Sequence, residues 1–104
     1  MASDAGRVQL DALLLGALRG EPAHGYEIIH RLKMRSGDVF RLPEGTVYPV
    51  LHRLEREGLV RSRWTEASGR RRRVYRLTRR GEEALAARRR EWRALARAVE
   101  AVLS

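Results

Sequence analysis

The chain has 104 residues, 43% of them hydrophobic, which suits one small domain with a single modest core. It contains no cysteine, so disulfides, thiolate catalysis and cysteine-ligated zinc are excluded. Its formal net charge is +9, and all but one of its 22 basic residues are arginine, whose guanidinium binds phosphate through paired hydrogen bonds.

The positive charge is concentrated in the second part of the chain. The first 58 residues hold 8 Lys or Arg and 8 Asp or Glu, whereas the remaining residues hold 14 and 5. This asymmetry favours a polyanionic partner, although arginine-rich coding bias and solvated surfaces would give the same count. No apolar run approaches the roughly 18 residues of a membrane-spanning helix, and no secretion signal begins the chain. We therefore expect a cytoplasmic protein.

Two helices are expected in the first part of the chain. Residues 1–8 show no periodicity and are predicted to be a flexible N-terminal tail. From Leu10 to Leu18 the apolar residues follow a helical period, which Gly20 stops. A second helix is predicted near residues 24–36, where Gly37 ends it.

A third helix is predicted within residues 43–60, which read PEGTVYPVLHRLEREGLV. Thr46 is the expected N-cap, because Pro49 then falls at the third helical position, where its missing N–H costs little. An earlier start would put that proline in the helix interior at a cost of roughly 3 kcal/mol. Gly58 is the expected left-handed residue at the C-terminus.

The two faces of this third helix differ. One carries an apolar stripe that suits packing on a core. The other carries hydrogen-bonding side chains, as a helix that reads a DNA groove requires and as an ordinary surface helix also has. The outward residues are Tyr48, Pro49, His52, Arg53 and Arg56, which offer an aromatic hydroxyl, an imidazole and two guanidiniums.

After Gly58 the pattern changes from a helical to an alternating period, which predicts a β-hairpin. A strand leads past Trp64 to a turn at residues 66–69, and a return strand follows. Residues 70–73 are four successive arginines at the tip and return arm. Because like charges repel, this run needs either full solvation or an anionic partner.

The last predicted helix begins at the N-cap Thr78 and carries apolar residues at seven-residue spacing. Such a stripe predicts a seam with the same helix of a second copy, while packing within its own domain is the alternative. The expected dimer interface consists of Leu85, Trp92, Leu95, Val99 and Val102.

These elements define the expected fold class, which is mainly α (α+β). Residues 9–77 would form a winged helix-turn-helix domain, with three helices plus a two-stranded β-wing. Residues 78–104 would form a long C-terminal dimerisation helix. In this fold the third helix enters the major groove of DNA and the hairpin lies along its backbone.

Three strings of the chain resemble the PadR family of bacterial transcriptional regulators, in order and at the family's separations. They read LLLGALRGEPAHGYEI, LPEGTVYPVLHRLEREGLV and GRRRRVYRLTRRG. The single helix after the hairpin resembles the short-form members. One departure is Glu44, which precedes the Gly-Thr pair where many members have a serine and a proline.

The resemblance implies a homodimer that binds a pseudo-palindromic DNA operator and represses transcription. The implied DNA-facing start of the third helix consists of Gly45, Thr46, Tyr48 and Pro49, with Tyr26 in support. One turn later, His52 and Arg53 are expected on physical grounds to contact bases or phosphates. Arg70, Arg71 and Arg72 of the hairpin would hold phosphate or reach the minor groove.

Short members of the family often sense aromatic or cationic small molecules at the dimer interface. Trp92 matches the tryptophan that stacks on such a ligand, and simple packing at a heptad position is the alternative.

Residues for other chemistry are few. His24, Glu27 and His30 share a helix but make an incomplete metal site, so no metal or cofactor is expected. No phosphate-cradling loop or catalytic triad is apparent, and we expect no enzyme activity. The alternative to a sequence-specific regulator is a non-specific nucleic-acid-binding architectural or protein-interaction module.

Overall fold

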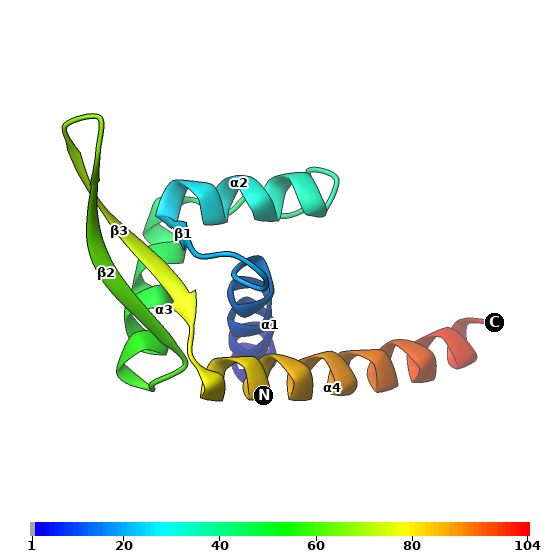
Figure 1. Cartoon of the computed structure of the whole chain (residues 1–104). Helices are drawn as coiled ribbons and strands as arrows, with labels where there is room; N and C mark the ends of the chain where they lie inside the picture. Colours follow the sequence, from blue (N-terminus) through cyan, green and yellow to red (C-terminus); the bar gives the residue numbers. More distant parts are fainter. Residues whose placement is uncertain (1) are drawn as a thin grey trace.

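The computed structural model describes the backbone of residues 2–104 and the side chains of residues 9–104. Within them the element order is α1 (Ala2–Ala17), β1 (Ala23–His24), α2 (Gly25–Arg35), α3 (Glu44–Arg56), β2 (Val60–Ala67), β3 (Arg70–Leu77) and α4 (Arg79–Leu103). The β2–β3 hairpin stands beside α3, and α4 extends away from the body formed by the other elements (Figure 1). The predicted winged helix fold with a long last helix is confirmed.

Helix α1 begins before the apolar periodicity does. Its bounds reach back to Ala2, whereas the leucine period starts at Leu10. The flexible tail expected at residues 1–8 lies outside the residues whose side chains are described, and it stays a prediction. The chain leaves the helix near Gly20, whose φ of 94° is a conformation that glycine adopts without steric cost.

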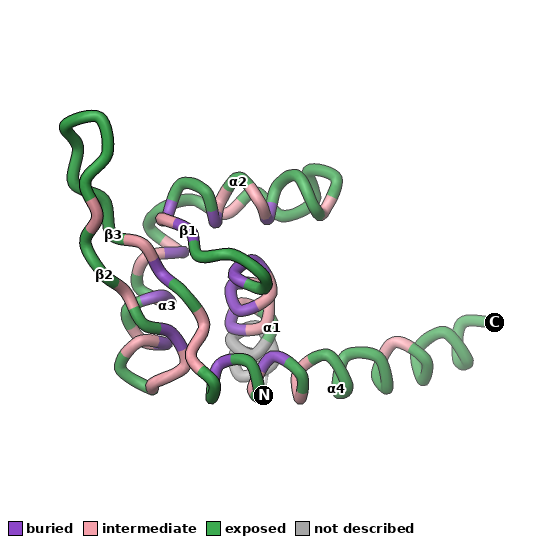
Figure 2. The backbone as a smooth tube through the Cα atoms, in the orientation of Figure 1, coloured by how far each residue is buried: buried purple, intermediate pink, exposed green. Residues whose placement is uncertain are grey.

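One hydrophobic core lies where α1, α2 and α3 meet the base of the hairpin (Figure 2). Each fully buried aliphatic side chain contributes about 1.5–3 kcal/mol by leaving water. The apolar stripe predicted for the third helix points into this core, and so do the buried residues of α2. Its largest fully buried members are Tyr75, Leu14, Leu15, Ile28, Leu51, Leu54, Val47 and Val60.

The predicted start of the third helix is wrong. The N-cap of α3 is Pro43 rather than Thr46, and Pro49 therefore lies inside the helix. Proline has no N–H to donate to the carbonyl of Gly45, so one helical hydrogen bond is missing there. The N–H groups of Thr46 and Val47 both donate to the Pro43 carbonyl, at 3.0 and 3.1 Å, which closes a first turn ahead of the proline. Core packing of the later turns supplies the stability that this helix needs.

The predicted end of the same helix is confirmed. Gly58 has a φ of 78° and follows the C-cap Glu57. Its N–H donates to the Glu55 carbonyl at 3.0 Å, and the N–H of Leu59 donates to the Leu54 carbonyl at 2.9 Å. This pair of bonds is the Schellman motif, which satisfies the last carbonyls of α3 and turns the chain directly into β2.

The hairpin is longer than predicted. Strand β2 pairs antiparallel with β3 along its whole length, so the turn consists of Ser68 and Gly69 alone. Their φ values of 53° and 76° are both positive, as the two-residue hairpin turn that matches strand twist requires. The wing therefore projects well beyond the core (Figure 1).

The sheet has a third strand that the sequence did not predict. The short strand β1 pairs with the other edge of β3, with Ala23 opposite Tyr75 and His24 opposite Val74. Two residues are too few to show an alternating period, and His24 stood at the predicted start of the second helix. The strand order is β1-β3-β2, so β3 lies between the start of α2 and the rest of the hairpin.

The first turns of α4 are fixed to the domain. Thr78 is the N-cap, as predicted, and its hydroxyl accepts from the Gly81 N–H at 3.1 Å while donating to the Gly58 carbonyl at 2.6 Å. Gly81 is buried, and a Cβ there would lie 1.9 Å from the Leu59 carbonyl oxygen. Beyond Leu85 the helix is mostly exposed (Figure 2). No helix in the described part of the chain is both long and apolar enough to cross a membrane.

Candidate nucleic-acid interface

The outward face of the first turns of α3 gathers several of the predicted DNA-binding residues. Gly45, Pro49 and His52 are exposed, while Thr46 and Tyr48 are partly buried. No atom approaches within 4 Å of the position that a Cβ on Gly45 would take, so this part of the backbone is open. The rings of Tyr48 and His52 lie 6.4 Å apart, one turn from each other. Together these groups present a hydroxyl, a phenol and an imidazole on one surface.

Tyr48 is held in place by the start of α2. A Cβ on Gly25 would lie 2.1 Å from the Tyr48 hydroxyl oxygen, so the phenol packs where only glycine leaves room. Burial first, and the negative charge of Glu44 second, raise the pKa of Tyr48. The phenol therefore stays protonated at neutral pH and keeps a hydrogen-bond donor at the junction of the two helices.

Tyr26 and Glu44 meet across the same junction. Tyr26 is 65% exposed on α2, as its predicted place beside the DNA-facing surface requires. A side-chain hydrogen bond with Glu44, followed by the charge of that carboxylate, raises the pKa of Tyr26. Glu44 is in the first turn of α3, where the helix dipole favours a negative charge. This acidic residue thus stabilises the start of the helix.

The prediction that Arg53 faces a nucleic acid is wrong. Its guanidinium turns inward and pairs through two nitrogens with the carboxylate of Asp11, a residue of α1 that is only 6% exposed. It also contacts Glu57, at 3.4 Å. The hydrogen bond with Asp11 raises the pKa of Arg53. Periodicity placed this arginine at the margin of the outward face and could not reveal its acidic partner 42 residues earlier in the chain.

The wing arginines have distinct surroundings. The guanidinium of Arg71 lies 4.7 Å from the ring centre of Trp64, and that of Arg73 lies 5.6 Å from it. Arg73 also donates to the Ser62 hydroxyl at 2.7 Å and pairs with Glu55 of α3 at 3.4 Å. Nη1 of Arg72 lies 2.8 Å from Nε2 of His24, while Arg70, also predicted to bind DNA, is exposed beside the turn.

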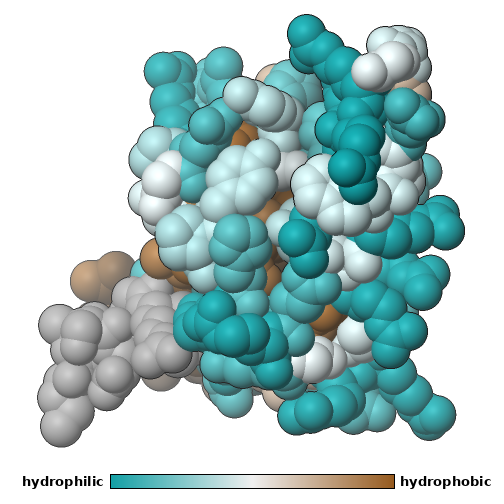
Figure 3. Space-filling view, turned by 90° about the vertical axis from the view of Figure 1, so that its left-hand side faces the viewer, coloured by the Kyte–Doolittle hydropathy of each residue, from teal (hydrophilic) through white to brown (hydrophobic). Residues whose placement is uncertain are grey.

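Trp64 is a functional candidate that sequence reasoning did not assign to this surface. It is 55% exposed on β2, directly opposite Arg73 on β3. The alternating sequence pattern places Trp64 on the same face of the strand as Val60. It does not show which residue lies opposite Trp64, because that depends on the strand register set by the two-residue turn. Figure 3 looks onto this side of the molecule, which is mostly hydrophilic with small apolar areas between the polar side chains.

The seam residues predicted on α4 divide into two groups. Leu85 is 7% exposed and belongs to the core of its own chain, so its assignment to the dimer interface is wrong. The heptad pattern failed there because packing on α1 and packing on a second copy use the same apolar stripe. Four further seam residues are exposed and remain available for association: Trp92, Leu95, Val99 and Val102.

A groove of about 740 Å³ lies between α1 and α4. Its apolar lining residues include Leu13, Phe40, Leu85, Trp92 and Leu95. Its other lining side chains include four arginines and one glutamate: Arg19, Arg35, Arg88, Arg89 and Glu91. Trp92, the predicted ligand-stacking residue, therefore lines a groove whose charged lining residues carry a net positive charge.

The fold and this surface define a winged helix protein with a basic wing next to an open recognition helix. Residues 14–87 match the Transcriptional regulator PadR-like family, and the chain belongs to that family. It is 32% identical over 91 residues to an uncharacterized protein of Lysinibacillus sphaericus, covering 86% of this chain and 84% of the relative. It is 50% identical over 60 residues to a transcriptional regulator of Mycobacterium tuberculosis, covering 58% of this chain and 56% of that one.

Solved structures with the same fold include regulators from several bacteria. A PadR family transcription regulator of Clostridium difficile is 33% identical, with a TM-score of 0.80 and coverage of 91% of this chain and 98% of that one. Bacillus subtilis PadR, crystallised in complex with operator DNA, is 29% identical with a TM-score of 0.70. The match covers 76% of this chain and 45% of the longer Bacillus protein. The family and these neighbours are transcription regulators rather than enzymes.

Proposed function

We propose that this protein is a sequence-specific transcriptional repressor that binds a pseudo-palindromic operator as a homodimer. The observation that carries the proposal is the placement of an open helix start and an arginine-rich wing on one side of the domain. The operator complex of Bacillus subtilis PadR supports DNA as the partner. Such a repressor acts in the cytoplasm, where the DNA is.

In this proposal the two parts of the surface have different tasks. Thr46, Tyr48 and His52 face base edges in the major groove, where hydroxyl, phenol and imidazole groups can donate and accept. Gly45 and Pro49 allow the backbone to approach closely. Arg70, Arg71 and Arg72 bind phosphates or enter the minor groove, so they set affinity and register more than sequence preference. Arg53 is left out, because Asp11 already binds its guanidinium.

The homodimer proposal rests on the exposed stripe of α4. A helix that leaves Trp92, Leu95 and Val99 in water is unfavourable alone, and a second copy of the same helix would cover them. A two-fold dimer would place two recognition helices in successive major grooves, about 34 Å apart.

A small-molecule effector in the groove between α1 and α4 would release the repressor. Trp92 offers an aromatic surface for stacking, as the prediction requires. Four arginines and one glutamate on the lining favour an aromatic compound with an acidic group over a cationic one. The Nε of Arg88 is buried and has no hydrogen-bond partner among the described residues, which supports an acceptor on such a ligand.

Selection of bound duplexes from a random library tests sequence specificity. We expect one family of sequences, bound at least about 1000-fold more tightly than an unrelated duplex of equal length at the same salt concentration. The selected site should read the same on both strands, with half-sites one helical turn apart. Equal affinity for all duplexes would instead support the non-specific architectural module, because its arginines would bind backbone alone.

A further inference from the structure

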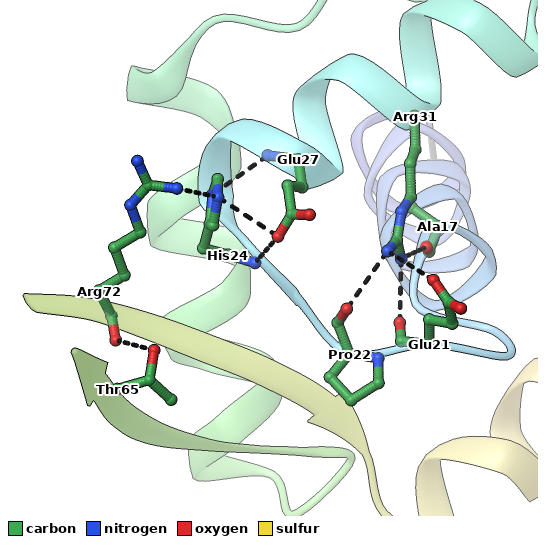
Figure 4. Close-up of polar contacts among 8 residues, drawn as sticks. All are labelled: Ala17, Glu21, Pro22, His24, Glu27, Arg31, Thr65 and Arg72. Atoms are coloured by element: carbon green, nitrogen blue, oxygen red, sulfur yellow. Dashed lines mark hydrogen bonds and ion pairs between the residues drawn. The ribbon is translucent and has the colours of Figure 1, made fainter. Parts of the chain in front are cut away.

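Two N–H donors point at the imidazole of His24. The backbone N–H of Glu27 lies 3.3 Å from Nδ1, and Nη1 of Arg72 lies 2.8 Å from Nε2 (Figure 4). A neutral imidazole has one lone pair and one N–H, so it accepts from only one of these donors at a time. Oε1 of Glu27 also lies 3.3 Å from Nε2, so an Nε2–H tautomer would serve the helix cap, whereas a lone pair on Nε2 would serve Arg72. The contact with Arg72 is the shortest of these contacts, which favours the lone pair on Nε2.

The start of α2 does not depend on the imidazole alone. Oε1 of Glu27 accepts from the backbone N–H of His24 at 3.1 Å, which is one half of the capping box. The ring can therefore serve the wing while the glutamate side chain still caps the helix. Figure 4 shows the result, in which the guanidinium of Arg72 reaches from β3 across to the ring at the beginning of α2.

We propose that His24 is a positioning residue for nucleic-acid binding, which holds Arg72 of the wing ready for a phosphate. This inference rests on the proposed function. Arginine has five N–H donors, so one bond to His24 leaves enough donors for a bidentate phosphate contact. An arginine that is already ordered loses less side-chain entropy on binding, and pre-ordering of one such residue increases affinity by about 3- to 10-fold.

The substitution His24→Asn separates the two tasks of the side chain. Asparagine is a good N-cap and supplies an acceptor for the Glu27 N–H, but it is too short to reach Arg72. We expect about 3- to 10-fold weaker binding to the selected duplex and to an unrelated one, with an unchanged dependence on salt. His30→Asn is the matched control, since His30 is exposed on the same helix, and it should bind like the wild type.

A double-mutant cycle tests whether His24 acts through the wing arginine. Arg72→Ala alone should reduce the salt slope by about 0.9 for the lost phosphate contact. In that background His24→Asn should have no further effect. Equal losses in both backgrounds, or no loss in either, would overturn the proposal. If no preferred duplex is found, the repressor proposal fails, while binding to the unrelated duplex still tests His24.

The ring protonation gives an independent test on the wild-type protein without DNA. Nitrogen-15 NMR of the imidazole should show Nε2 unprotonated and Nδ1 carrying the hydrogen. An Nε2–H tautomer would mean that the ring serves the helix cap instead, and the positioning role would be rejected even if His24→Asn proved too unstable to study.

Discussion

At the scale of single residues, the pair formed by Asp11 and Arg53 joins α1 to α3. Both side chains are largely withdrawn from water, and the carboxylate receives two guanidinium nitrogens. Desolvating two charges is expensive, so such a pair is weak support for stability as long as both members are present. Removing one member is different, because the other is then left uncompensated in the interior.

Replacing Arg53 with methionine should therefore lower the free energy of unfolding by about 2–4 kcal/mol, a value reduced from that of a fully buried pair because Arg53 keeps some exposure. Urea denaturation measures the change. Arg56→Met, at an exposed position on the same helix, should change stability by less than about 0.5 kcal/mol. If both variants unfold alike, the ion pair has no structural role.

Tyr75 predicts how stability changes at alkaline pH. Burial is the main reason that the pKa of this phenol is raised. The folded state therefore holds the phenol proton more tightly than the unfolded chain does. The contribution of this proton to the free energy of unfolding is fully present below the ordinary tyrosine pKa of about 10, and it is lost as pH rises through the higher folded pKa. The free energy of unfolding should fall less steeply above about pH 10 in Tyr75→Phe than in the wild type. Parallel profiles would contradict this.

At the scale of elements, the sequence predicted those helix ends that depend on the residue type at a single position. Gly58 and Thr78 were placed correctly because a positive φ and a hydroxyl cap are properties of single positions. The start of α3 was missed because core packing outweighs the hydrogen bond that Pro49 removes. Strand β1 was missed because its pairing with β3 is visible only in three dimensions. The same reason explains why the inward direction of Arg53 could not be predicted.

Two helical glycines provide a comparison at this scale. Gly81→Ala should destabilise the protein by about 1–3 kcal/mol, because its Cβ would collide with the Leu59 carbonyl oxygen and separate α4 from the end of α3. Gly45→Ala has open space around the new methyl group, so better helix propensity should make it neutral or stabilising by up to about 1 kcal/mol. Thermal unfolding of both variants would test the contrast, which similar Tm shifts would contradict.

The wing should act on DNA as a unit. Replacing Arg70, Arg71 and Arg72 with alanine should weaken binding to every duplex and reduce the salt slope by about 0.9 for each lost phosphate contact. Fluorescence anisotropy titrations at several salt concentrations measure the slope. A variant with the wild-type slope would show that the hairpin does not contact the backbone of DNA.

At the scale of the whole molecule, the exposed stripe on α4 determines the expected assembly. Val99→Arg places a charge on this stripe and should convert a dimer into a monomer, because two arginines would then face each other across the two-fold axis. Glu100→Arg is the matched control one position away, and it should stay dimeric. Light scattering coupled to size-exclusion chromatography distinguishes the two. A stable wild-type monomer would remove the basis of the paired half-sites.

Helix α4 runs without interruption from Gly81, buried in the domain, to the stripe that ends near Val102. It therefore acts as a rigid spacer. In the proposed dimer the length of α4 and the direction of its apolar stripe set the distance and rotation between the two DNA-binding domains. Inserting one residue near Arg90 would turn the stripe by about 100°. Point substitutions on α3 can then change the base sequence of the operator that is bound. The spacing between the two half-sites can change only when α4 gains or loses residues.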